Sequence, residues 1–486
     1  MSETAGIAML VAVAALLIAT GLPAWQVLLG VAMAFAGGGM IAGVFALPLL
    51  TAMPSRLLGL LEQDILQALP LYVLMGVLLN RLPLAEILFR TGNRALARSG
   101  ASPSLTGLGL GVLLAPMNGA VGASVAMLSH TVQPRLEASG VPLAKGAALV
   151  CVASTMGVVI PPSLVLILLG DAMMRAHTEA TILTHESVRI INTQDVFVGA
   201  LVPAAILFTL CALVAWRTNR GATHAAGATP PTLREWVTAG ATIAFIGSLF
   251  TGVTLGYLYA VEAAAFGAVA LFAFGLATGT LTRHVLSGVL RDTMAVTGAL
   301  FALLLAATMF TLVVRAFGTD RWLAKALVQL GMGETGSLLV VLAIIAACAL
   351  VLDAFEMIFV VIPVAMPPLL TLVHDATWVS VLTLLILQAS FLAPPFGYAV
   401  LMVRNSVRRG LSLMGLSRAL LPYLAAQLLV LALVLAWPAL IWQRNPSTLT
   451  ANDQGLAPTL PVSEDEARRM LERQLPAPPG DSDGKE

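Results

Sequence analysis

Long apolar runs separated by short polar stretches fill most of the chain between Ile7 and Trp442. A helix needs about 20 consecutive apolar residues to cross the hydrocarbon core of a bilayer. Many of these runs reach that length, and none alternates between apolar and polar residues as barrel strands do. The pattern therefore predicts an all-α polytopic membrane protein. Its apolar segments are predicted at about 7–22, 25–52, 66–80, 104–132, 146–174, 196–216, 236–258, 261–280, 293–315, 335–370, 377–403 and 418–442.

Composition supports this class, because 58% of the 486 residues are hydrophobic and only 10% are charged. Soluble domains carry about 25% charged residues. The net charge of +1 predicts no nucleic-acid partner, and the predicted environment is the lipid bilayer. The three cysteines are far apart in apolar sequence and the six histidines lack metal-ligand spacing, so both types are interpreted as packing residues. The N-terminus "MSETAGIAML" lacks a positive stretch, so the first helix is predicted to be retained.

The two halves of the chain share one plan. In the first half, "GAVGASVAMLSH" (119–130) interrupts an apolar segment, and "TMGVVIPPSLVLILLG" (155–170) follows with a Pro-Pro pair. In the second half, "LVLDAFEMIFVVIP" (350–363) interrupts an apolar segment, and "FLAPPFG" (391–397) follows. Interrupted segments at corresponding positions of two halves indicate the binding site of a secondary transporter.

Arginines place three connections on the cytoplasmic side, because Lys and Arg collect in cytoplasmic loops. These connections are 80–100, 217–235 and 404–409. Two cytoplasmic connections must be separated by an even number of membrane crossings. Between 80–100 and 217–235 this holds if the segment 104–132 enters and leaves the membrane on one side. The two halves then have opposite orientations.

A helix that ends inside the membrane leaves backbone groups without helical partners. Its last carbonyls suit a cation, and the first N–H groups of the next helix suit an anion such as a carboxylate. Two facing breaks therefore predict a pocket for an anionic solute and its coupling cations. Pro394 and Pro395 end the helix there, and Gly397 allows a tight turn or a close approach.

Ionisable residues within apolar segments are functional candidates by default. Asp353 and Glu356 lie in the second interrupted segment, and Glu262 lies in "YAVEAAAFG". Each also fits a helix-end residue that faces water, and this interpretation is favoured for Asp171 and His130. Hydroxyl oxygens are available as well, although buried Ser and Thr more often bond to their own helix. The hydroxyl candidates are Ser124, Ser129, Ser154, Thr155 and Ser163.

These residues resemble the large membrane subunit of the tripartite ATP-independent periplasmic (TRAP) transporters over nearly all of 7–442. "MGVVIPPS" (156–163) is similar to the family's Leu-Gly-x-x-Ile-Pro-Pro-Ser pattern, and "GASVA" (122–126) to its Gly-Ser-Ser-x-Ala tip. "VEAAAFGA" (261–268) resembles the Thr-Glu-Ala segment, and "LQASFLAPPFGYAV" (387–400) the Thr-Pro-Pro-x-Gly break. The last stretch is most similar to the branch named for mannitol, chloroaromatic or 2-oxo acid uptake.

The resemblance implies a Na⁺-coupled elevator in the bacterial inner membrane, without an organic cofactor. It also implies two partners, a small TRAP membrane subunit and a periplasmic solute-binding protein, and a small organic anion as solute. The implied Na⁺ sites comprise Ser124, Gly157, Val159 and Pro161 in one half and Ala393, Pro394 and Gly397 in the other. The candidate solute contacts are Gly122, Ser124, Ser163, Asp353 and Pro395.

Under this resemblance the chain divides into eight parts. They are N-terminal scaffold helices (1–80), an amphipathic cytoplasmic arm (81–100), a first transport repeat of hairpin plus broken helix (101–174), a polar outer loop (175–195), scaffold helices and linker (196–334), a second transport repeat (335–410), a C-terminal helix (411–443) and a polar tail (444–486).

Three positions depart from the family pattern and leave the Na⁺ stoichiometry open. Ala123 stands where Ser is usual, Ala393 where Thr is usual, and Leu350 where Gly is common. The alternative function is a stand-alone inverted-repeat anion carrier without a binding protein. An intramembrane enzyme is less favoured, because Ser124 and His130 do not share a helical face and no G-x-S-x-G nucleophile motif is present. The chain is therefore predicted not to be an enzyme.

Overall fold

The regular structure of the chain is helical throughout its described residues, as the apolar pattern predicts. The computed structural model describes residues 4–44, 54–55, 58–59, 62, 64–118, 120–161, 163–184, 190–221, 230–329, 331–407 and 410–441. The predicted polar tail at 444–486 lies outside these residues.

Within the described residues, six helices are long and apolar enough to cross a membrane. They are α2 (Ala24–Ile41), α12 (Thr193–Thr218), α13 (Leu233–Leu255), α14 (Ala260–Ala277), α15 (Arg283–Ala316) and α22 (Leu413–Ala436). A seventh candidate span is the pair formed by α5 (Asp64–Arg81) and α6 (Leu84–Ala95), which bends by 63° where they meet. The shorter elements outside the two repeats are α1 (Ala5–Thr20), η1 (Ala97–Ser99), α16 (Thr319–Gln329) and η5 (Pro438–Leu440).

The two predicted repeats contain the same order of elements: helix, interruption, helix, then a broken helix. The first comprises α7 (Ser102–Leu114), η2 (Ala115–Asn118), α8 (Val121–Thr131), α9 (Gln133–Ala138), α10 (Leu143–Thr155), η3 (Met156–Val158) and α11 (Leu164–Thr184). The second comprises α17 (Gly333–Cys348), α18 (Ala354–Glu356), the π-helix η4 (Met357–Val361), α19 (Ile362–Leu370), α20 (Ala376–Leu392) and α21 (Tyr398–Ser406).

Both predicted helix breaks at the Pro-Pro pairs are present. Helical structure ends at Val158 and resumes at Leu164 in the first half, and it ends at Leu392 and resumes at Tyr398 in the second. Ser163 begins the new helix in the first half, because its Oγ accepts a hydrogen bond from the Leu166 N–H at 3.0 Å. The breaks follow from the missing backbone donor and fixed φ of proline.

The first interruption lies earlier than predicted. Residues 121–130 of the expected break form the helix α8, and the preceding helix α7 ends at Leu114. Pro116 explains the shift, because it has no backbone N–H to donate to the preceding turn, and the chain continues from Ala115 as the 3-10 helix η2. The second interruption is at Ala349–Asp353 in the described structure, so it begins one residue before the predicted stretch 350–363 and covers only the start of that stretch.

The predicted outer loop at 175–195 is helical in its first ten residues, because α11 continues to Thr184. Polar side chains do not end this helix. Arg175 pairs with Asp171 one turn earlier, and the Thr178 hydroxyl donates to the Met174 carbonyl at 2.8 Å. Residues 190–192 are not helical, and α12 then begins with the Asn192 side chain as its cap.

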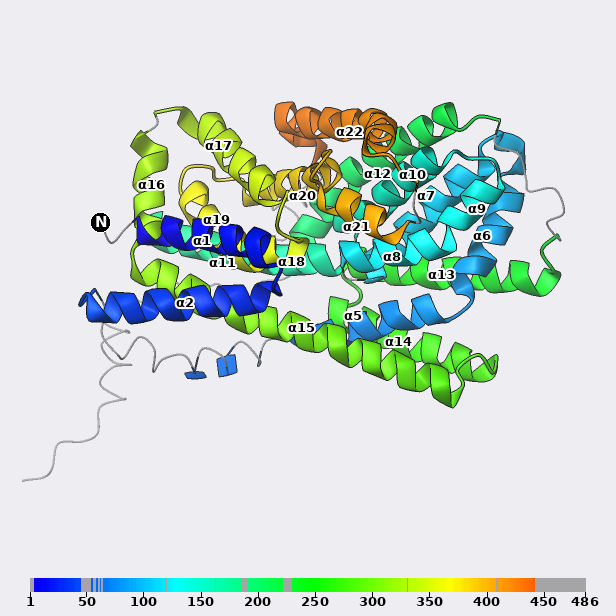
Figure 1. Cartoon of the computed structure of the whole chain (residues 1–486), viewed down its shortest axis with the longest axis horizontal. Coiled ribbons are helices and arrows are strands. Elements are labelled where there is room, and N and C mark those ends of the chain that lie inside the picture. The colour runs from blue at the N-terminus through cyan, green and yellow to red at the C-terminus, as the bar shows by residue number, and fades with distance from the viewer. Residues whose placement is uncertain are drawn as a thin grey trace, which may run out of the picture. The chain divides into compact units, whose positions relative to one another are not determined.

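The two repeats pack against each other. Helix α8 of the first repeat contacts α21 of the second, and α10 contacts both of them. Figure 1 shows α8 in cyan beside α21 in orange. Helix α11 contacts α19 and α20 in the same way. The broken helices and both hairpins therefore meet in one region, while α15 runs along α2 and α5.

The predicted arm at 81–100 contains the helix α6, which has one apolar face. Leu84, Leu88 and Phe89 are buried, and α6 packs on α7 and α13. Arg90 on the polar side pairs with Glu235 of α13 at 2.7 Å.

Candidate functional site

In the first repeat, three segments meet at the Ala115 carbonyl. The Ser124 hydroxyl, in the first turns of α8, is buried and donates to the Ala115 oxygen at 3.4 Å. Gly157 in η3 lies against the same peptide group, since a Cβ there would be 2.6 Å from the Ala115 carbonyl carbon. Only glycine permits this approach. The structure therefore brings together two of the predicted cation-site residues, Ser124 and Gly157.

The rest of the first break is a buried turn. The Val159 N–H donates to the Met156 carbonyl at 3.2 Å, and both Val159 and Pro161 are buried. Ser163, a predicted solute contact, has a local role, because its hydroxyl caps α11. The N–H groups of Val159 and Ile160 are thus satisfied within the turn by the Met156 carbonyl, as irregular backbone in a membrane protein requires.

In the second repeat, Ala393 and Gly397 close a tight turn. The Gly397 N–H donates to the Ala393 carbonyl at 2.8 Å. A Cβ on Gly397 would lie 2.5 Å from the Phe391 carbonyl oxygen. Pro394 within the turn is half-buried, and Pro395 is exposed. The turn thus presents its prolines outward while its glycine packs against the end of α20.

The second interruption ends at Asp353, which begins α18. The Asp353 N–H donates to Oε2 of Glu356 at 3.1 Å. The Oδ1 atom of Asp353 is buried and has no hydrogen-bond partner in the described part of the chain. Buried polar atoms in proteins are usually paired, so this oxygen is a candidate ligand for a cation or solute.

Tyr398 connects these pieces, and the sequence analysis missed it. A Cβ on Gly122 of the first hairpin would lie 3.2 Å from the Tyr398 hydroxyl oxygen. The carboxyl groups of Asp353 and Glu356 in the second hairpin lie near the same phenol. Its ring lies 6.1 Å from the Phe391 ring across the second break. The sequence feature that could have identified Tyr398 is its position directly after Gly397, at the start of α21.

Other sequence candidates have structural roles. Oε2 of Glu262 accepts from the Tyr259 N–H at 2.9 Å and so caps α14. His130 is exposed near the end of α8. Asp171 pairs with Arg175, and the Ser154 hydroxyl donates to its own helix at the Val150 carbonyl. The placement of His130 agrees with its interpretation as a helix-end residue that faces water. That interpretation is wrong for Asp171, which lies inside α11 with its side chain only 16% exposed.

The chemistry available at the site is that of oxygen atoms and helix ends. Within the described residues, no three His, Cys, Asp or Glu side chains converge on a metal position. Carbonyl and hydroxyl oxygens are the ligands that hard cations prefer. The orphaned Asp353 oxygen and the Ser124–Ala115 pair therefore fit a hard cation such as Na⁺. The N-terminal ends of α11 and α21 favour a carboxylate.

The helix breaks lie at matching positions of the two halves, and the fold brings them into one region. This arrangement is typical of membrane transporters. Solved transporters share the fold. The YdaH transporter of Alcanivorax borkumensis matches with a TM-score of 0.56 at 18% identity, covering 82% of this chain and 90% of that one. Neisseria gonorrhoeae MtrF, described among antimetabolite efflux pumps, matches at 0.51 and 16% identity over 81% and 83% of the two chains.

The family model described as "Tripartite ATP-independent periplasmic transporter, DctM component" matches residues 11–440. The chain belongs to this family, which confirms the family predicted from the sequence motifs. It is therefore a transporter component and not an enzyme, and a multi-pass protein of the bacterial inner membrane.

Named relatives are C4-dicarboxylate TRAP transporter large permease proteins DctM. The Pseudomonas aeruginosa protein is 25% identical over 78% of this chain and 85% of its own length. The Rhodobacter capsulatus protein is 22% identical over 78% and 86%. The sialic acid TRAP transporter permease protein SiaT of Haemophilus influenzae is 22% identical over 80% of this chain and 61% of SiaT.

Proposed function

We propose that this chain is the large permease subunit of a Na⁺-coupled, binding-protein-dependent transporter that imports a small organic anion. The observation that carries the proposal is the meeting of both repeats at Tyr398, because α8 packs on α21 and the Tyr398 hydroxyl adjoins Gly122 of the first hairpin. The relatives are named for C4-dicarboxylates and sialic acid, which are carboxylate anions. A 2-oxo acid or dicarboxylate is the proposed solute class, as in the branch that the second break resembles.

The proposed roles follow from the chemistry of each position. Oxygen ligands near Ser124, Gly157, Val159 and Pro161 would hold one Na⁺, and those of the turn from Ala393 through Pro394 to Gly397 a second. Gly122, Ser124, Ser163 and Pro395 are proposed to line the solute position. An ionised carboxylate repels an anion, so Asp353 would contact a solute hydroxyl or the coupling cation instead.

The proposed partners are a small membrane subunit and a periplasmic solute-binding protein, as the family description "tripartite" indicates. The parts 101–174 and 335–410 are proposed to move together as the transport domain of an elevator. Contacts of α8 with α21, and of α11 with α19 and α20, support this grouping. The remaining membrane helices are proposed to form the scaffold.

Reconstituted uptake separates this proposal from a stand-alone carrier. Proteoliposomes would hold this chain and its small subunit, and the binding protein would be added outside with labelled succinate or 2-oxoglutarate. We expect uptake only when the binding protein is present. Equal uptake without it would favour the stand-alone carrier.

Ser124→Ala tests the proposed cation site. The variant removes the hydroxyl that meets the Ala115 carbonyl, so we expect the Na⁺ concentration for half-maximal uptake to rise about tenfold. Ser380→Ala is the matched control, because the Ser380 hydroxyl is equally buried but donates to its own helix at the Ala376 carbonyl. Identical Na⁺ dependence of the two variants would remove Ser124 from the site.

A further inference from the structure

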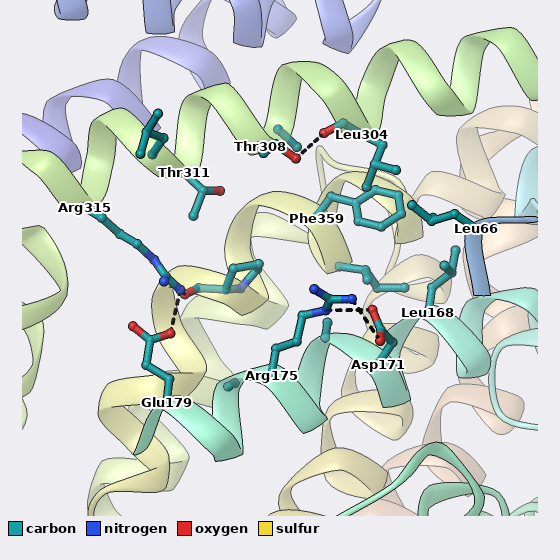
Figure 2. A pocket seen from close by; sticks show the side chains of 16 residues that line it. Leu66, Leu168, Asp171, Arg175, Glu179, Leu304, Thr308, Thr311, Arg315 and Phe359 are labelled. Carbon is teal, nitrogen blue, oxygen red and sulfur yellow. Dashed lines mark hydrogen bonds and ion pairs between the residues drawn. The ribbon is translucent and has the colours of Figure 1, made fainter. Parts of the chain in front are cut away.

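A cavity of about 260 Å³ lies between the two repeats and the long helix α15 (Figure 2). Its walls come from α11, α15, η4 and Pro363 of α19, with Leu66 of α5 at one end. Leu168 and Asp171 in its wall follow the first break by four and seven residues of α11. At 1.5 Å per residue, the cavity begins within about 10 Å of that break. It lies on the side of the breaks that is predicted to be outer.

Four charged side chains line this cavity. On α11, Asp171, Arg175 and Glu179 are spaced four residues apart, so they share one face of the helix. Nε of Arg175 lies 2.9 Å from Oδ2 of Asp171. From the opposite wall, Nη2 of Arg315 lies 2.7 Å from Oε2 of Glu179. Figure 2 shows the Arg315–Glu179 pair between the two walls and the Arg175–Asp171 pair along α11. Charged side chains that line a cavity between apolar helices are candidates for a functional site.

Both arginines are accessible to a ligand. The side chain of Arg175 retains 49% of its exposure and that of Arg315 retains 34%. Arg315 also donates from Nη2 to the Pro363 carbonyl at 3.1 Å, which fixes its head group at the cavity wall. The guanidinium groups of Arg175 and Arg315, each fixed by its ion pair, therefore line a cavity large enough for a small molecule.

Two further polar atoms of the wall are buried without a hydrogen-bond partner among the described residues. They are Nε of Arg315 and the hydroxyl oxygen of Thr311, one turn apart on α15. Thr308 on the same helix behaves differently, since its hydroxyl donates to the Leu304 carbonyl at 2.8 Å. An unmade bond costs about 1–3 kcal/mol per buried group, so such pairs of donors indicate a ligand or water.

We propose that this cavity is a second binding site for a small carboxylate anion, in series with the site at the helix breaks. The inference rests on the proposed import of an organic anion. Arg315 and Thr311 donate to the carboxylate, and Arg175 adds positive charge, as the planar guanidinium group suits carboxylate oxygens. Leu168, Leu304 and Phe359 would contact the carbon skeleton.

The size and charge of the cavity suit a transient site for a small acid. Its volume lies just below the range of roughly 300–1,000 Å³ that drug-sized ligands occupy. Asp171 and Glu179 compete with the anion for the two arginines. The anion must displace them, so binding is weak and release toward the helix breaks is fast.

Equilibrium binding of labelled succinate and 2-oxoglutarate to the purified complex of this chain and its small subunit tests the proposal. We expect two sites in the native protein. Arg315→Gln and Thr311→Val should each weaken the outer site, the arginine change by about tenfold or more. Glu179→Gln should tighten it, because it releases Arg315 from its competing carboxylate.

Opposite effects of Arg315→Gln and Glu179→Gln on the affinity for the anion distinguish a binding site from a structural ion pair. A pair that only joins α11 to α15 would make Arg315→Gln and Glu179→Gln behave alike, and that result would overturn the proposal. Arg81→Gln is the control, because Arg81 pairs with Asp292 away from the cavity. One native site that no cavity variant alters would overturn this inference alone. No binding of either acid, with no uptake of either, would overturn the proposed function with it.

Discussion

A Gly157→Ala variant is expected to lose at least about nine-tenths of its solute uptake and to unfold at a lower temperature. The added Cβ would lie 2.6 Å from the Ala115 carbonyl carbon and 2.8 Å from both its oxygen and the Pro116 nitrogen. All three are backbone atoms, so no side chain can rotate away. The two 3-10 turns η2 and η3 must separate, and overpacking of this kind typically costs about 1–3 kcal/mol.

Gly109→Ala in the same repeat is the matched control. Gly109 lies inside α7 with no heavy atom within 4 Å of its would-be Cβ. We expect native uptake and equal or slightly higher thermal stability, because Ala favours helix over Gly by about 1 kcal/mol. Thermal unfolding in detergent and reconstituted uptake measure both effects. Native uptake by Gly157→Ala would contradict the close contact of η2 and η3.

Gly397→Ala is expected to have the second large effect, again about a tenfold loss of uptake or more. Its Cβ would lie 2.5 Å from the Phe391 oxygen and 2.9 Å from the nitrogen and oxygen of Ala393. Relief of these overlaps opens the turn closed by the bond from the Gly397 N–H to the Ala393 carbonyl. Tyr398 follows directly in the chain, so its contact with Gly122 is disturbed as well.

Gly298→Ala on α15 serves as the control, because no heavy atom lies within 4 Å of its would-be Cβ. We expect the KM for the solute and the maximal rate of Gly298→Ala to match those of the native protein. If Gly397→Ala also matched the native KM and rate, the second break would have no part in the solute site.

The features predicted from sequence are those that local chemistry decides. Apolar length predicts the helices, and proline chemistry predicts the breaks at Pro161 and at Pro394–Pro395. The errors are also local. The first interruption was placed too late because the effect of Pro116 was overlooked, and α11 was ended too early because its polar face was interpreted as a loop.

Features that depend on tertiary contacts could not be predicted from one sequence. Tyr398 meets Gly122 only because α8 packs on α21, and these helices are far apart in the chain. Arg315 and Glu179 are 136 residues apart and meet across the cavity. Neither contact follows from a regular spacing of residues in the sequence. The cavity could therefore be identified only from the three-dimensional structure.

The most direct test of the proposed transport is Na⁺-driven uptake of labelled succinate and 2-oxoglutarate. Proteoliposomes holding this chain and its small subunit would receive binding protein outside, with and without an inward Na⁺ gradient. The proposed site predicts accumulation of one of these acids only under the gradient. Equal uptake without Na⁺, or no uptake of either acid under the gradient, would contradict it.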